Sequence, residues 1–172
     1  MNKKQVTIMA ILGFGLNGCA VEPTASSETA EYKEELITNG RFLQGSEGWW
    51  AAGAELKSTD EMGCVTFSQK GKNPWDVILG QSGLALKKGQ NYDLQFSALA
   101  KQLINIKTLV QHNGAPYTNH FVQDISLTQN LKPFQFSFKP SGDDNNVQLQ
   151  FQMGTESPTT VCVKDVSLTG PK

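Results

Sequence analysis

Residues 147–153 read Val-Gln-Leu-Gln-Phe-Gln-Met, so apolar and amide side chains alternate with a period of two. Successive side chains of a β-strand point to opposite faces, and this alternation therefore predicts a strand with one buried face and one open face. The same period runs from Tyr92 to Ala98, and through 134–138, where three Phe side chains alternate with Gln and Ser. No window of helical length shows a period of 3.6, so strands are expected throughout the folded part.

Turn signals separate these alternating runs. The clearest are Gly71-Lys-Asn-Pro74, Lys88-Gly-Gln-Asn91, Asn113-Gly-Ala-Pro116 and Pro140-Ser-Gly-Asp143. Roughly ten short strands joined by such turns are typical of an all-β antiparallel sandwich or jelly roll.

The first residues predict export. Lys3 and Lys4 precede an apolar stretch, 6–16, that is too short to span a bilayer as a mature helix. The stretch ends in Leu16-Asn-Gly-Cys19, which resembles the lipobox of bacterial lipoproteins. The resemblance implies that residues 1–18 are a signal peptide and that Cys19 is lipidated, with Ala20 favouring the outer membrane. Ordinary signal cleavage, which would leave a soluble secreted protein, is the alternative.

The remaining chain has two parts. Residues 19–34 lack apolar periodicity and are expected to form a flexible tether behind the lipidated Cys19, while residues 35–172 form one β-sandwich domain. Loss of residues 1–18 moves the formal charge from −1 to −3, and basic patches are absent. We therefore expect no nucleic-acid partner, and we expect a monomer that meets the membrane through its N-terminal lipid.

Cysteine usage fits an exported protein. With Cys19 assigned to lipid, Cys64 and Cys162 remain for a disulfide in an oxidising compartment. Two buried free thiols are the alternative.

Amides stand on the open face of the strand at 147–153, where Gln148, Gln150 and Gln152 form a row. The strand 104–111 presents Lys107 and Gln111 outward, and a third run presents Gln81 on the same face as Trp75. An amide can bridge two ring hydroxyls without a charge to desolvate, and an aromatic ring offers flat apolar area to a pyranose. The pattern alone also fits a merely solvated face.

Several segments together resemble the family-four carbohydrate-binding modules of bacterial endoglucanases. They are Leu36-Ile-Thr-Asn-Gly-Arg-Phe42 with Gly48-Trp49, Asn73-Pro-Trp-Asp-Val77, 107–117, 148–154 and 161–168. The resemblance covers nearly the whole domain and implies a jelly roll with an open groove across one sheet, here expected as a stand-alone lipoprotein. It also supports the disulfide at Cys162. Its ligands would be β-glucans, with the linkage and chain length left open.

Site residues follow from the resemblance position by position. The cleft amides of the family fall on Asn113, Gln148 and Gln152, the cleft aromatic on Tyr117, and the cleft Arg on Lys107. A further amide position falls on Gln81 or, with a shift of one residue, on Ser82, and the alternation favours Gln81.

Tryptophans complete the expected groove. A second cleft aromatic of the family corresponds to Ala52, so Trp50 or Trp75 is expected to supply that ring. Adjacent residues of a strand face opposite ways, and we assign Trp49 to the core and Trp50 to the outer surface. Trp75 either contacts ligand or fills the end of the sandwich.

No cofactor or metal is expected. Related modules hold a structural calcium with an Asp at the position of Lys164, and an ammonium group cannot coordinate calcium. His112 and His120 have no third ligand at metal spacing and are expected to be surface or internally satisfied histidines.

The sequence predicts a non-catalytic binder. Glycoside hydrolysis needs two facing carboxyl groups, and the expected groove positions carry none. The alternative is a structural or protein-interaction lipoprotein of the outer membrane that keeps the sandwich without sugar binding.

Overall fold

The computed structural model describes residues 33–171, which fold into two antiparallel sheets. The six-stranded sheet contains β1 (Lys33–Glu35), β3 (Glu55–Thr59), β4 (Met62–Phe67), β6 (Tyr92–Ala100), β9 (Lys132–Phe138) and β11 (Thr159–Pro171). The five-stranded sheet contains β2 (Trp50–Ala52), β5 (Ile78–Leu86), β7 (Ile104–His112), β8 (Asn119–Leu127) and β10 (Asp144–Gln152). The predicted β-sandwich is confirmed.

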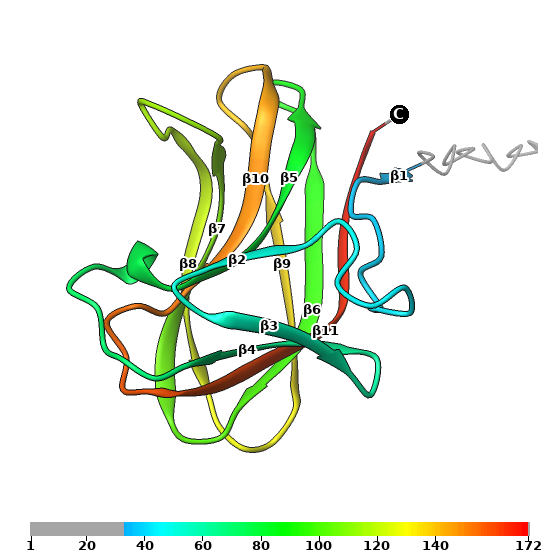
Figure 1. Cartoon of the computed structure of the whole chain (residues 1–172). Coiled ribbons are helices and arrows are strands. Elements are labelled where there is room, and N and C mark those ends of the chain that lie inside the picture. Colours follow the sequence, from blue (N-terminus) through cyan, green and yellow to red (C-terminus); the bar gives the residue numbers. More distant parts are fainter. Residues whose placement is uncertain (1–32, 172) are drawn as a thin grey trace, which may run out of the picture. The chain divides into compact units, whose positions relative to one another are not determined.

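The chain passes repeatedly between the two sheets. The strand orders are β3-β4-β11-β6-β9, with β1 on β11, and β2-β5-β10-β7-β8. Figure 1 shows the two layers, with β5, β7, β8 and β10 in one and β6, β9 and β11 in the other. The alternating strand at 147–153 is β10, which lies at the centre of its sheet between β5 and β7.

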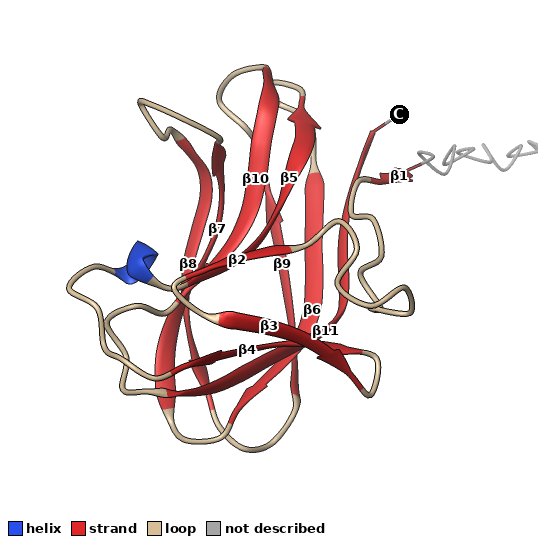
Figure 2. Cartoon of the chain, viewed as in Figure 1, coloured by secondary structure: helices blue, strands red, loops and turns tan. Residues whose placement is uncertain are grey.

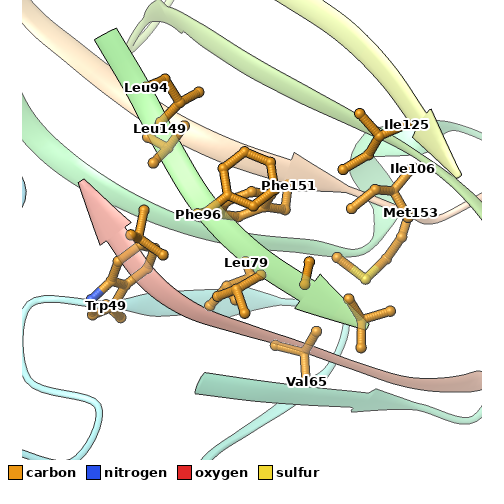
Figure 3. Close-up of a cluster of buried hydrophobic side chains, with 14 of the residues drawn as sticks. Trp49, Val65, Leu79, Leu94, Phe96, Ile106, Ile125, Leu149, Phe151 and Met153 are labelled. Carbon is orange, nitrogen blue, oxygen red and sulfur yellow. The ribbon is translucent and has the colours of Figure 1, made fainter. Parts of the chain in front are cut away.

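The core lies between the layers, where one side of each strand is apolar. Leu149 and Phe151 of β10 are fully buried and face β6, whose Phe96 meets Phe151 edge-on at a centroid distance of 4.9 Å. Figure 3 shows these side chains with Trp49, which is 7% exposed. The assignment of Trp49 to the core is therefore confirmed.

Phenylalanines close one side of the sandwich, where β8 and β9 are the edge strands. Phe121 of β8 stacks on Phe138 of β9 and contacts Phe136, with both centroid distances at 5.3 Å. The β9 phenylalanines are only half-buried because an edge strand has a neighbour on one side alone.

The N-terminal boundary differs from the expected one. β1 pairs Lys33–Glu35 with Thr169–Pro171 of β11, so the sandwich includes residues assigned to the tether. Lys33 also pairs with Asp93, and this contact, together with a hydrogen bond from the Ser137 hydroxyl, holds the pKa of Asp93 below its ordinary 3.8. Residues 36–42, which carry part of the resemblance, form no strand, and their bends and turns bury Phe42 against Trp49.

A disulfide joins Cys64 of β4 to Cys162 of β11, as predicted, across directly paired positions of the six-stranded sheet. The alternative of two free thiols is wrong. Nearby, the Lys164 ammonium lies 3.4 Å from the Glu61 carboxylate. No helix in the described part of the chain is long and apolar enough to cross a membrane.

Candidate functional site

The outer face of the five-stranded sheet carries three rows of side chains that the strand register brings together. One row holds Ser82, Gln148, Gln111 and Asn119; the next holds Trp50, Gly80, Gln150, Leu109 and Val122; the third holds Ala52, Ile78, Gln152, Lys107 and Asp124. Each row crosses several strands, so the face is a continuous surface assembled from segments far apart in the sequence.

A cleft of about 660 Å³ opens on this face. Its lining residues come from β5, β7, β8 and β10, from the β7–β8 loop and from the short 3-10 helix η1 (Pro74–Asp76). They are Pro74, Trp75, Ile78, Lys107, Leu109, Gln111, Tyr117, Asn119, Gln150 and Gln152.

Amide side chains form much of the cleft floor, and they are held in place. Gln150 and Gln152 are only 3% and 6% exposed, and the Gln152 amide donates a hydrogen bond of 2.6 Å to the Gln150 carbonyl oxygen. Gln148 lies on the same outer face one row away and is equally buried, but it does not line the cleft itself. The predicted row of three glutamines is therefore present on the open face.

Apolar side chains complete the floor. Ile78 and Leu109 are buried, yet they lie apart from the core cluster between the sheets because they point to the outer face. Sequence analysis missed both of them, as well as Pro74 and Asn119. Leu109 could have been found, since it stands midway between Lys107 and Gln111 in the alternation of β7.

Two exposed aromatic rings line the cleft. Trp75 is 57% exposed and Tyr117 is 58% exposed. Trp75 therefore contacts the cleft rather than filling the end of the sandwich. It belongs to η1, which Figure 2 shows in blue outside the strands.

Local hydrogen bonds fix the turn that carries Trp75. The Asp76 carboxylate accepts the backbone N–H groups of Asn73 at 2.9 Å and Lys72 at 2.7 Å, and these bonds hold the pKa of Asp76 below its ordinary 3.8. Gly154 donates its N–H to the Pro74 carbonyl at 2.8 Å, and a Cβ there would collide with the Asn73 carbonyl oxygen. The turn therefore depends on glycine at position 154.

Trp50 lies on the outer face, as predicted, at the β2 edge of the middle row. Its indole N–H donates to the Ser82 hydroxyl at 3.0 Å, and its ring lies over Gly80, where an added Cβ would come within 2.6 Å of the ring. Trp50 does not line the cleft but extends the aromatic surface beyond it.

Lys107 brings a charge to the cleft, and Asp124 balances it. The ammonium group lies 2.7 Å from the Asp124 carboxylate, whose side chain is 72% exposed. The pair sits in one row on neighbouring strands.

The prediction for Gln81 is wrong. Gln81 is 2% exposed and lies on the inner side of β5, opposite the fully buried Leu149. Its amide group accepts the Thr38 N–H at 2.8 Å and donates to the Thr38 carbonyl at 2.8 Å. It anchors the segment before β2, and Ser82 is the residue of this pair that faces outward.

Asn113 is exposed beyond the end of β7 and does not line the cleft. Its backbone N–H donates to the backbone carbonyl of Asn146 at 2.7 Å, and its own backbone carbonyl accepts the side-chain amide of Asn146 at 2.8 Å. Between residues 33 and 171, no three or more His, Cys, Asp or Glu side chains are grouped to hold a metal ion.

Comparisons with known proteins agree with this geometry. Residues 34–160 match the model of a family described as "Carbohydrate binding domain". The chain is 29% identical to endoglucanase C of Cellulomonas fimi over 94% of its length, but it spans only 15% of that enzyme.

Two solved structures are similar over most of the described sandwich. A CBM4 structure is 25% identical with a TM-score of 0.72, covering 78% of this chain and 99% of that one. The N-terminal cellulose-binding domain of Cellulomonas fimi β-1,4-glucanase C is 28% identical with a TM-score of 0.66, covering 79% of this chain and 97% of that domain.

Proposed function

Because the chain belongs to the family of carbohydrate-binding domains, we propose that its cleft holds a β-glucan-type chain along the outer face of the five-stranded sheet. The family is non-catalytic, so the chain binds carbohydrate without cleaving it. The observation that carries the β-glucan proposal is the cleft itself, in which buried, uncharged amides adjoin an apolar floor and two exposed rings.

This composition suits a neutral sugar chain. Each amide has two donor hydrogens and one acceptor oxygen, and after the bond between Gln152 and Gln150 the remaining N–H groups of this pair and the Gln111 amide suit pairs of ring hydroxyls. Their burial fixes the side chains before ligand arrives, so binding loses less side-chain entropy. Trp75 and Tyr117 offer flat apolar area to the C–H faces of pyranose rings.

A β-glucan is the favoured ligand because the names of similar proteins refer to glucan or cellulose. They are endoglucanase C of Cellulomonas fimi and the N-terminal cellulose-binding domain of the β-1,4-glucanase C of the same organism. Beyond the cleft, the outer face continues to Trp50, which adds a further aromatic ring to it.

Affinity electrophoresis of residues 20–172 tests the proposal. Gels would contain hydroxyethyl-cellulose, barley β-glucan, laminarin, xylan or an α-glucan control. We expect retardation by one or more β-glycans, and weaker retardation with Tyr117→Ala. The matched control is Tyr92→Phe, which changes a tyrosine of the buried core. Migration unchanged by every β-glycan would overturn the proposal and favour the protein-interaction reading.

We also propose that the protein is exported and anchored to the outer membrane through lipid on Cys19. Residues 1–18 and Cys19 lie outside the described residues, and the support is the lipobox-like sequence together with the Cys64–Cys162 disulfide, which is typical of oxidising compartments. Metabolic labelling with a radioactive fatty acid should mark the wild-type protein and not the Cys19→Ser variant. Equal labelling of the two would refute the anchor.

A further inference from the structure

A buried carboxylate lies behind the loop that carries Tyr117. The loop, residues 113–118, leaves β7 after His112 and enters β8 at Asn119. Both histidines that flank it, His112 and His120, turn toward Asp144 at the start of β10. These three side chains come from three strands and border a second, shallow cavity of about 440 Å³ that is separate from the cleft.

The contacts to Asp144 are short. His112 Nδ1 lies 3.0 Å from both carboxylate oxygens, His120 Nε2 lies 2.8 Å from one of them, and the Asn146 N–H donates at 3.0 Å. The Asp144 side chain is 10% exposed and that of His120 is 4% exposed. The bond between His120 and Asp144 is therefore shielded from water, whereas the His112 side chain is 31% exposed and borders the cavity.

Asp144 is charged in this arrangement. Burial alone would raise its pKa, but hydrogen bonds from His120, the Asn146 N–H and His112 together bring the pKa below 3.8. An ionised carboxylate only accepts hydrogen bonds, so both ring nitrogens that face it carry protons. The carboxylate thus fixes the orientation of both imidazole rings.

The same short segment of β10 also holds the backbone of the loop. Asn146 exchanges two hydrogen bonds with the backbone of Asn113, as described above. Across the loop, the His112 N–H donates to the Thr118 carbonyl at 2.8 Å. The Tyr117 N–H donates to the Gly114 carbonyl at 2.6 Å.

Tyr117 itself has little else to hold it. Its ring is 58% exposed, and its backbone adopts a φ of +57°, a left-handed conformation that a non-glycine residue keeps only when its surroundings impose it. The direction of the ring is therefore set by the loop, and the loop is set by its two ends.

We propose that Asp144 is a positioning residue for glycan binding, which fixes His112 and His120 and thereby aims Tyr117 into the cleft. The inference rests on the proposed function, and it assigns a role in that function to a carboxylate that contacts no part of the cleft.

A double-mutant cycle tests the inference by isothermal titration with barley β-glucan. We expect Asp144→Ala to weaken glycan binding about tenfold. In a protein that already carries Tyr117→Ala, the same change should alter the affinity less than about twofold, because Asp144 acts through the contact between the Tyr117 ring and the glycan. Asp144→Asn keeps one acceptor oxygen and should restore part of the affinity. Asp143→Ala removes a neighbouring exposed carboxylate that accepts the Lys88 N–H, and it should leave binding unchanged.

Other outcomes separate this inference from the proposed function. If Asp144→Ala weakens binding equally with and without Tyr117, the positioning role is wrong while sugar binding stands. If Tyr117→Ala binds normally but Gln150→Ala does not, the inference again fails alone.

Hydrogen exchange on the unliganded protein provides a test without glycan. Amide exchange at His112, Asn113 and Tyr117 should rise in Asp144→Ala and not in Asp143→Ala. Equal exchange in the two variants would overturn the inference even if no glycan bound. Melting curves identify any variant that fails to fold.

Discussion

Replacing Gln150 with alanine should separate sugar binding from stability. The side chain lies in the central row of the outer face, is 3% exposed, and accepts a hydrogen bond of 2.6 Å from the Gln152 amide. Loss of that bond leaves the Gln152 amide on a cleft that water can enter. The free energy of unfolding should therefore fall by no more than about 1.5 kcal/mol.

The effect on binding should be larger. An amide that bridges two ring hydroxyls makes two hydrogen bonds, each contributing about 0.5–1.5 kcal/mol net. Their loss amounts to about 1–3 kcal/mol, which weakens binding about 5- to 150-fold.

Isothermal titration with barley β-glucan measures the affinity, and urea unfolding measures the stability. The matched control is Gln95→Ala, which removes an exposed glutamine from β6 in the other sheet and should leave the affinity unchanged. An affinity for Gln150→Ala within about twofold of wild type would refute the assignment of this amide to the sugar. An equal loss in Gln95→Ala would refute the assignment of the binding face.

Three further predictions concern stability and the cleft wall. Joint replacement of Cys64 and Cys162 by alanine should lower the free energy of unfolding, measured in urea, by about 2–5 kcal/mol, because the disulfide closes a loop with a sequence separation of 98. Equal stability of the wild type and the double variant would contradict this. Asp93 and Asp144 have folded-state pKa values below 3.8, so the stability that they contribute is present above pH 3.8 and is lost as pH falls through those lower values. Melting temperatures should thus fall more steeply in acid for wild type than for Asp93→Asn, and parallel curves would refute this. Gly154→Ala should displace the 3-10 turn and weaken glycan binding in titration. Gly142→Ala is the control, because an added Cβ there meets open space, and equal affinities of these two variants would contradict the role of the turn.

Local sequence was sufficient where a strand has one apolar side. In β10, Leu149 and Phe151 had to be buried, so the intervening glutamines had to face outward, and the structure agrees. The same reasoning assigned Trp49 to the core and Trp50 to the surface.

Periodicity failed where both sides of a strand are apolar. In β5, Ile78 and Leu79 are both buried, one beneath the cleft and one in the core, so alternation could not say which side Gln81 takes. Its position depends on Thr38, a hydrogen-bond partner 43 residues away that local sequence does not identify.

The sequence by itself determined the sandwich and the amide row, because both depend on side-chain polarity along a strand. It favoured the pair of Cys64 and Cys162, which the structure established. Only the tertiary structure decided the apolar floor, the inward turn of Gln81 and the grouping of Asp144 with His112 and His120. Those features arise from contacts between strands that are distant in the chain, and such contacts depend on register and packing, which a periodic pattern does not specify.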